Sequence, residues 1–190
     1  MPGEGSPRIE GAPVVWTVGH SNRTLEELVA LLREHGIELV ADVRRYPASR
    51  RHPHFAKDEL RLALPRAAIA YEHLVELGGH REPRPDSPHR ALPPGPFRGY
   101  ADHMATPEFA RARARLLDLA RTRRVAALCA EARPEHCHRR LLADALLAAG
   151  ATVRHLIADE GEVDHVLHSS ACVHDGGVVY SRVDQPSLFD

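Results

Sequence analysis

The chain reads VVWTVGHSNRTLEELVALLREHGIELVADVRR over residues 14–45, and this stretch decides the fold. It begins with a short apolar run, mostly β-branched, that predicts a buried strand. Thr24 and Glu27 then make a T-x-x-E capping box, and the leucines that follow recur at helical spacing as far as Gly36, which predicts a helix. Residues 37–43 predict a second strand. A strand–helix–strand unit of this kind places its two strands parallel in one sheet.

Helices and strands continue to alternate along the rest of the chain, and Thr106-Pro107-Glu108 is a typical helix start. This alternation predicts a single α/β domain, with a mostly parallel sheet of about five strands and helices on both faces. Residues 78–99, rich in Gly, Pro, His and Arg, predict a long irregular loop, and Asp175-Gly176-Gly177 predicts a hairpin turn. The further elements expected are helices at 57–64, 106–121 and 135–149 and strands at 68–74, 125–129 and 152–157.

Length and composition narrow the class of protein. The chain has 190 residues, 43% of them hydrophobic, and a formal net charge of −1, which predicts a globular protein rather than a general polyanion binder. It has no apolar run of about 18 residues and no signal pattern, so we expect a cytoplasmic protein without a membrane partner. The expected organisation is a disordered lead at 1–12, the α/β domain at 13–170 and a C-terminal extension at 171–190.

Polar side chains follow the predicted strands at the point where each strand ends. In open α/β sheets, ligands bind beyond the carboxyl ends of the strands. The segments at these positions are Gly19-His20-Ser21, Asp42-Val43-Arg44-Arg45, Gly78-Gly79-His80-Arg81 and Cys129-Ala130-Glu131. We therefore expect a site at this edge of the sheet, with Cys137, Glu131, His20 and Asp42 as its catalytic residues.

Cys137 stands at the expected start of the 135–149 helix, beside His136, His138 and Arg139. The positive end of the helix dipole and these basic neighbours would lower the pKa of its thiol and favour the thiolate. A thiolate can act as a nucleophile or as a metal ligand. The pattern therefore predicts either role for Cys137.

Three further residues at the strand ends have two interpretations each. Glu131 is placed for general acid or base work, although a salt bridge to a nearby arginine would also explain it. His20 suits proton transfer or contact with a phosphate, or else a hydrogen bond to a neighbouring loop. Asp42 would orient His20 or an arginine, or form a structural ion pair.

A metal site is an alternative use of the cysteines. Cys129, Cys137, His138 and His20 would supply a four-ligand set of nitrogen and sulfur donors. The spacing C-x7-C-H is not a standard zinc pattern, and Cys129, at the end of an apolar strand, could equally be a buried inert thiol. The cofactor therefore stays open, with a metal ion as one alternative.

Several short motifs occur in a characteristic order: GHS, DVRRYPAS, LGGHR, FRGYADHM and CAE…CHR. As a set, over residues 14–157, they resemble the domain of unknown function 488 family. The resemblance implies a small α/β domain but no reaction. Its motif residues here are His20, Ser21, Asp42, Arg44, Pro47, Ser49, Gly78, Gly79, Arg81, Arg98, Gly99, Tyr100, Cys129, Glu131, Cys137, His138 and Arg139. Among them, Ser21, Arg44, Arg81, Arg98, Tyr100, His138 and Arg139 are expected to bind substrate or phosphate.

The last six residues read QPSLFD. They resemble the Q-x-x-L-F peptide with which bacterial replication and repair proteins bind the sliding clamp, with Gln185, Leu188 and Phe189 at the matching positions. Pro186 departs from that pattern, in which leucine is commoner. An extended tail with two adjacent apolar side chains can fill a groove on a partner. The alternative is a tail that folds back on the domain or is disordered.

Two functional hypotheses follow. The first is an enzyme that acts on a nucleotide, a nucleic-acid end or a modified base in DNA repair or processing, as a hydrolase or transferase dependent on Cys, Glu and His. The second is a repair accessory that binds nucleic acid or protein without catalysis, its Cys/His cluster being structural. The first predicts a pocket that joins His20, Asp42, Glu131 and Cys137. The second predicts that these side chains are separated or packed against apolar groups.

Overall fold

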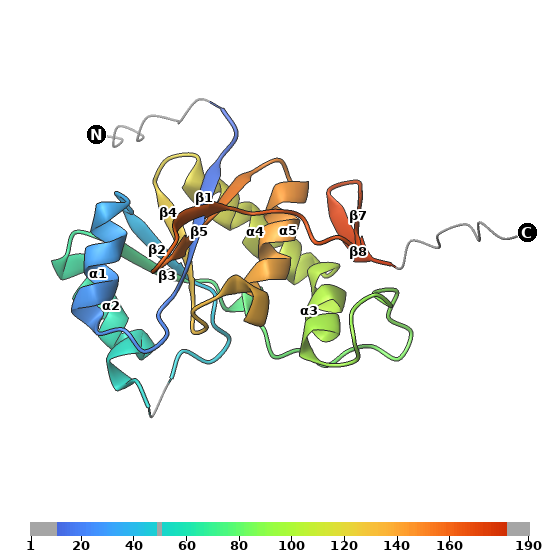
Figure 1. The fold of residues 1–190 in the computed structure, drawn as a ribbon, viewed down its shortest axis with the longest axis horizontal. Helices are drawn as coiled ribbons and strands as arrows, with labels where there is room; N and C mark the ends of the chain where they lie inside the picture. Colours follow the sequence, from blue (N-terminus) through green and yellow to red (C-terminus); the bar gives the residue numbers. More distant parts are fainter. Residues whose placement is uncertain (1–10, 49–50, 182–190) are drawn as a thin grey trace, which may run out of the picture.

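A computed structural model describes residues 11–48 and 51–181. At its centre lies a six-stranded sheet in the order β3-β2-β4-β1-β5-β6, in which only β6 runs antiparallel to its neighbour. The predicted α/β class and mostly parallel sheet are confirmed (Figure 1). The strands are β1 (Val14–Gly19), β2 (Leu39–Asp42), β3 (Ala70–His73), β4 (Val125–Cys129), β5 (Thr152–Ile157) and β6 (Gly161–Asp164).

Helices cover both faces of this sheet, as the sequence predicts (Figure 1). Alternate residues of β1 show how the two cores form, because successive side chains of a strand point to opposite faces. Val15 packs in the core beneath α4 and α5, whereas Trp16 and Val18 pack in the core beneath α1 and α2. The helices are α1 (Leu25–Glu34), α2 (Lys57–Arg66), α3 (Pro96–Met104), α4 (Pro107–Ala120) and α5 (Arg139–Ala148), with short 3-10 turns η1 (Pro53–Phe55), η2 (Val75–Leu77) and η3 (Pro134–His136).

The expected helix starts at Thr24 and Thr106 are confirmed. The backbone N–H of Glu27 donates to the Thr24 hydroxyl at 3.1 Å, and its carboxylate accepts from the Thr24 backbone N–H at 2.7 Å. The hydroxyl of Thr106 caps α4 in the same way, accepting from the N–H of Phe109. Both caps satisfy backbone donors that a helix start leaves without a partner.

Two of the expected boundaries are wrong. The 78–99 segment is not irregular to its end, because α3 begins at Pro96. The helix expected from residue 135 begins at Arg139, since Pro134–His136 form a separate 3-10 turn and Cys137 has an extended backbone. Cys137 therefore lies just before α5 rather than in its first turn.

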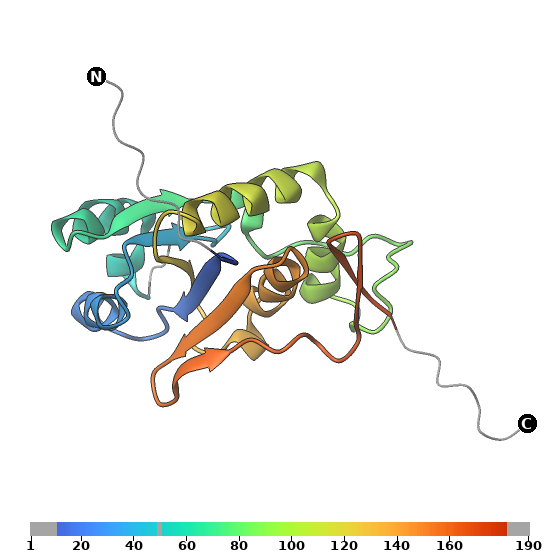
Figure 2. The same ribbon diagram turned by 90° about the horizontal axis from the view of Figure 1, so that it is seen from above.

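The hairpin expected about residues 175–177 is confirmed as β7 (Ala171–His174) and β8 (Gly177–Tyr180). It lies beside α3 and α5 (Figure 2). Tyr180 is fully buried, and its hydroxyl donates to Asp144 of α5 at 2.7 Å. No helix in the described part of the chain is both long and apolar enough to span a bilayer.

The sheet changes its direction of winding between β1 and β4. After β1 the chain passes to α1 on one face, and after β4 it passes to α5 on the other. The backbone N–H groups of His20 and Ser21 donate to the carbonyls of Cys129 and Ala130, at 2.9 and 2.8 Å. A crevice beyond the carboxyl ends of two such strands is the usual ligand site of an open α/β sheet.

Candidate functional site

Two adjoining cavities lie at this edge of the sheet, with volumes of about 320 and about 650 Å³. Arg44, Tyr46, Ala130 and Glu131 line both and form the wall between them. Both volumes are in the range of small-molecule sites. The smaller cavity is further lined by Arg45, His80, Pro96, Phe97, Cys129, His136, Cys137 and His138, and the larger by His20, Ser21, Asn22, Ala48, Arg51 and His52.

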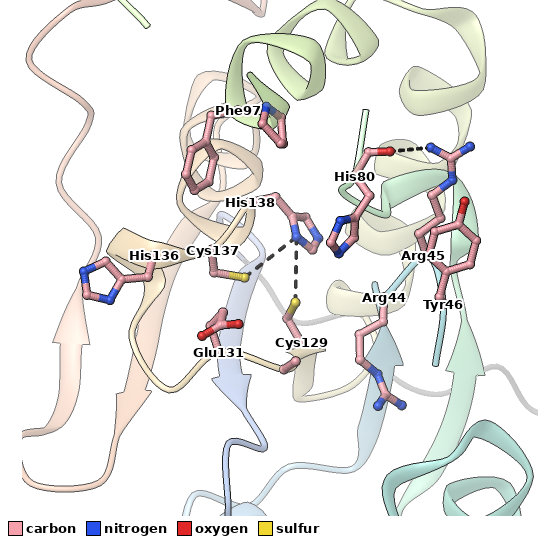
Figure 3. Close-up of a pocket in the computed structure, with 12 residues that line it drawn as sticks. Arg44, Arg45, Tyr46, His80, Phe97, Cys129, Glu131, His136, Cys137 and His138 are labelled. Atoms are coloured by element: carbon pink, nitrogen blue, oxygen red, sulfur yellow. Dashed lines mark hydrogen bonds between the residues drawn. The ribbon is translucent and has the colours of Figure 1, made fainter. Parts of the chain in front are cut away.

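Cys129, Cys137 and His138 come together in the smaller cavity (Figure 3). The Nδ1 atom of His138 lies 3.7 Å from the sulfur of Cys129 and 3.8 Å from the sulfur of Cys137. Both cysteines are buried, while His138 is partly exposed. The end of β4 and the turn before α5 thus bring three potential metal ligands or reactive groups to one point.

The hydrogen bonds of His138 fix which ring nitrogen carries a proton. Its Nε2 lies 3.1 Å from the carbonyl oxygen of Val43, and a carbonyl can only accept. Nε2 is therefore the protonated nitrogen of the neutral ring, and Nδ1 keeps its lone pair. That lone pair lies on the side of the two sulfur atoms.

Close packing holds the His138 ring in this position. The ring of Tyr100 meets it edge to face, with centroids 5.0 Å apart. On Gly79, an added Cβ would lie 2.8 Å from His138 Nδ1, closer than such atoms approach in proteins. Glycine in the LGGHR motif is therefore needed for the approach of the imidazole.

Cys129 and Cys137 interact, and their pKa values shift in opposite directions. The pKa of Cys129 is lowered well below its ordinary value because Cys129 accepts a hydrogen bond from Cys137 and lies near the basic groups His138 and Arg139. The pKa of Cys137 is raised by the neighbouring Cys129 and by burial. The neighbouring Cys129 and burial thus oppose the lowering of the Cys137 pKa that the sequence leads us to expect.

His20 belongs to the larger cavity. Its ring stacks on Phe55, with centroids 4.3 Å apart, and burial lowers its pKa to about 4. Its Nδ1 donates to the carbonyl of Ser21 at 3.0 Å, which leaves Nε2 as the unprotonated nitrogen. Ser21 itself has a φ of 51°, in the left-handed region, where the chain turns from β1 towards α1.

Asp42 lines neither cavity but holds Arg44, which lines both. The Asp42 carboxylate accepts from Nε and Nη2 of Arg44, at 2.9 and 2.6 Å, and from the hydroxyl of Tyr71 at 2.7 Å. Asp42 is fully buried and Arg44 is 6% exposed. The paired carboxylate helps to raise the pKa of Arg44 and fixes the direction of its planar guanidinium group.

A model of the family described as domain of unknown function DUF488 matches residues 24–146. The chain belongs to the DUF488 family. No curated protein and no solved structure matches it.

Several residues of the DUF488 motifs line neither cavity. Arg81 donates to the carbonyl of Gly78 at 3.0 Å, Arg98 to that of Leu92 at 2.9 Å and Tyr100 to that of Leu77 at 2.9 Å. The first two bonds lie within the 78–99 segment, and the third joins α3 to η2. Their observed contacts are structural rather than with a cavity.

The pocket expected to join four catalytic candidates is not found as one cavity. Cys137 lines the smaller cavity and His20 the larger, Glu131 lines both, and Asp42 lines neither. His20 is also absent from the group of potential metal ligands, which among the described residues comprises Cys129, Cys137 and His138.

Arg139 lines neither cavity. It is 1% exposed, and its Nη2 donates to the carbonyl of Glu131 at 2.8 Å. Its Nε and Nη1 atoms have no hydrogen-bond partner among the described residues. Its backbone N–H points to the sulfur of Cys137 at 3.5 Å.

The sequence patterns missed Pro96 and Phe97, which come to the smaller cavity from α3. A signal for this helix is present in the chain. Pro96 follows Gly95 as a helix-starting proline, and Phe97, Tyr100, Ala101 and Met104 recur at helical spacing. The density of Gly and Pro in residues 78–99 concealed that pattern.

Proposed function

We propose that the protein is an enzyme that acts on a nucleotide, a nucleic-acid end or a modified base, bound across the two adjoining cavities. The observation that carries the proposal is the shared wall. Arg44 and Glu131 stand between a cavity that suits an aromatic ring and a cavity that suits a phosphate. A nucleotide joins these two kinds of group in one molecule.

The smaller cavity offers flat and apolar surfaces for a base. Phe97 and Pro96 come from α3, and Tyr46 comes from the segment after β2. Aromatic side chains bind nucleobases by stacking, which contributes about 1–3 kcal/mol per base. His80 and His136 line the same cavity and can hydrogen-bond the edge of a ring.

The larger cavity offers groups that bind an anion. Arg51 lines it together with Arg44, whose guanidinium group is already oriented by Asp42. The hydroxyl of Ser21 and the amide of Asn22 add neutral donors. Arginine is well matched to phosphate because its planar donors can engage two oxygens at once.

The reactive groups would be His20, Glu131 and the Cys129–Cys137–His138 cluster. Glu131 lines both cavities, and His20 keeps a lone pair on Nε2. These groups suit proton transfer to or from a substrate during hydrolysis or group transfer. Cys137 lines the smaller cavity and supplies a sulfur donor.

Comparing turnover by closely related variants would test this function. The wild type, Glu131→Gln and Glu135→Gln would be assayed on a panel of nucleotides and of damaged oligonucleotides. Glu135 is exposed in η3 and lines neither cavity, so it is the matched control. We expect Glu131→Gln to lose at least about 100-fold in kcat, as removal of an acid or base commonly does, and Glu135→Gln to keep wild-type turnover. Full activity of Glu131→Gln would contradict the proposal.

The proposal places this activity in DNA repair or processing in the cytoplasm. Its support is the C-terminal sequence QPSLFD, which resembles a peptide that binds the sliding clamp. These residues lie outside the described part of the chain. A clamp partner would bring the two cavities to DNA without a strongly basic domain surface, in keeping with the net charge of −1.

A further inference from the structure

We infer that Cys129, Cys137 and His138 bind one zinc ion, with a fourth coordination position open to the smaller cavity. Their ligand atoms all lie within 4.8 Å of one another. Cys129 ends β4, whereas Cys137 and His138 follow η3 and are adjacent in the chain, so the backbone limits the separation of these two ligands. Cys172, in contrast, lies in β7 and belongs to no such group among the described residues.

The distances fit a tetrahedral ion. Zinc bonds of about 2.3 Å to sulfur and about 2.0 Å to nitrogen place neighbouring sulfur and nitrogen ligands about 3.5 Å apart. The observed separations from His138 Nδ1 are 3.7 Å to Cys129 and 3.8 Å to Cys137. A contraction of a few tenths of an ångström would complete the geometry.

The imidazole of His138 already has the tautomer and the orientation of a metal ligand. Metal-binding histidines nearly always donate their second ring N–H to a carboxylate, a carbonyl or water, which fixes the tautomer and the direction of the ring. His138 does so through Nε2, which donates to Val43 at 3.1 Å. Nδ1 therefore carries a lone pair at the position that faces both sulfurs.

Charge also favours the ion. On binding zinc, both thiols release their protons, so two thiolates balance the double positive charge and a neutral site results in a buried place. The N–H of Arg139 lies 3.5 Å from Cys137 Sγ, a contact that stabilises negative charge on sulfur.

The choice of metal follows from the donors. Two sulfurs and one imidazole nitrogen suit zinc, whereas magnesium and calcium prefer oxygen. No fourth Cys, His, Asp or Glu joins the group within the described residues, and all three ligands line the cavity. Three protein ligands with an open position are typical of catalytic zinc, at which water or a substrate oxygen binds.

Zinc content would test the inference directly. The full chain, purified without a histidine tag and dialysed against zinc and then against buffer, should retain about one zinc per chain. Cys137→Ser and His138→Ala should retain less than about one tenth as much. The matched controls are Cys172→Ser, outside the group, and His136→Ala, exposed at the rim of the same cavity. Both should bind as the wild type does.

A second measurement uses the wild type alone, so that it does not depend on whether the variants fold. Cobalt(II) substituted into the wild type should give the intense visible bands of a tetrahedral ion and a sulfur-to-cobalt charge-transfer band, and zinc should remove them. Wild-type protein with less than about one tenth of a zinc per chain would overturn the inference, and so would a disulfide between Cys129 and Cys137 under reducing conditions. Metal binding is measured without substrate. A failure to bind zinc can thus be told apart from a failure of the proposed enzymatic function. Only the catalytic use of the ion rests on that proposed function.

Discussion

The hydrogen bond from His138 Nε2 to the Val43 carbonyl, 3.1 Å long, joins the start of α5 to the end of β2. The two residues lie 95 positions apart in the chain. The bond sets the tautomer of the imidazole and turns Nδ1 towards the two cysteines. The site thus depends on the segments that follow β2 and β4. They are far apart in the chain and lie side by side because β2 and β4 are neighbours in the sheet.

Gly79→Ala should disturb this arrangement although it replaces none of the three proposed zinc ligands. The new methyl group would lie 2.8 Å from Nδ1 of His138 and would displace the ring. We expect zinc affinity to fall by about 10–100-fold, as for other losses of ligand orientation. Gly177→Ala is the control, because its Cβ would meet only a carbonyl at 3.3 Å. Equal zinc affinity of Gly79→Ala and the wild type would show that the ring position does not matter.

Asp42→Asn should destabilise the fold. It removes the charge partner of Arg44, and both side chains are nearly inaccessible, with 0% and 6% exposed. We expect a loss of about 3 kcal/mol in the free energy of urea unfolding, because an uncompensated buried charge is left behind. Asp86→Asn is the matched control, since its pair with Arg84 has the same two-residue spacing but is 59–70% exposed. Similar losses in the two variants would contradict this account of the Asp42–Arg44 pair.

The free energy of unfolding should fall in mild acid, partly because of His155. Burial lowers its pKa to about 4 in the folded state, and its ring faces Thr17 of β1, His165, and Asp144 and Arg139 of α5. The unfolded chain, with a pKa of 6.5, binds the proton first. The contribution of His155 is therefore complete above pH 6.5 and is lost as the pH falls to about 4, amounting to about 3 kcal/mol.

His155→Gln tests this pH dependence. Glutamine can still bond to Thr17 but cannot take up a proton, so the variant should lose less stability than the wild type between pH 7 and pH 4.5. Urea unfolding at several pH values measures the two slopes. Parallel curves for the two proteins would mean that another group controls the acid sensitivity.

Removal of residues 185–190 should abolish binding to a bacterial sliding clamp. Leu188 and Phe189 would be the apolar anchors and Gln185 the polar one. Surface plasmon resonance with immobilised clamp would compare the full chain, the truncated chain and Ser187→Ala, in which an unmatched position of the pattern is changed. We expect the full chain and Ser187→Ala to bind the clamp and the truncated chain not to bind it. Equal affinity with and without the tail would remove the clamp from the account.

The strands and the capped helices could be predicted because their signals are local. The capping box at Thr24 and the apolar run before Cys129 need no knowledge of the rest of the chain. The position of α3 was hidden, since Gly95 and its neighbouring prolines resemble a loop by composition. The start of α5 was misplaced because η3 takes the first two residues of the expected helix.

The candidate site was predictable as a location but not as a geometry. Strand ends indicated the edge of the sheet where His20, Glu131 and Cys129 lie. One partner of Asp42, Tyr71, comes from the neighbouring strand, and the opposite pKa shifts of the two cysteines depend on their meeting in the fold. Contacts of this kind require the register of the sheet, which a single sequence pattern does not contain.

Calorimetric titration of the wild type with a nucleoside 5′-monophosphate, its nucleoside and inorganic phosphate tests the central claim most directly. If one ligand spans both cavities, the monophosphate should bind at least about tenfold more tightly than either part. Phe97→Ala should weaken the nucleoside and Arg51→Ala the phosphate, while Arg61→Ala, exposed on α2, should change neither. No binding of the monophosphate, or equal affinity for it and its nucleoside, would contradict the account.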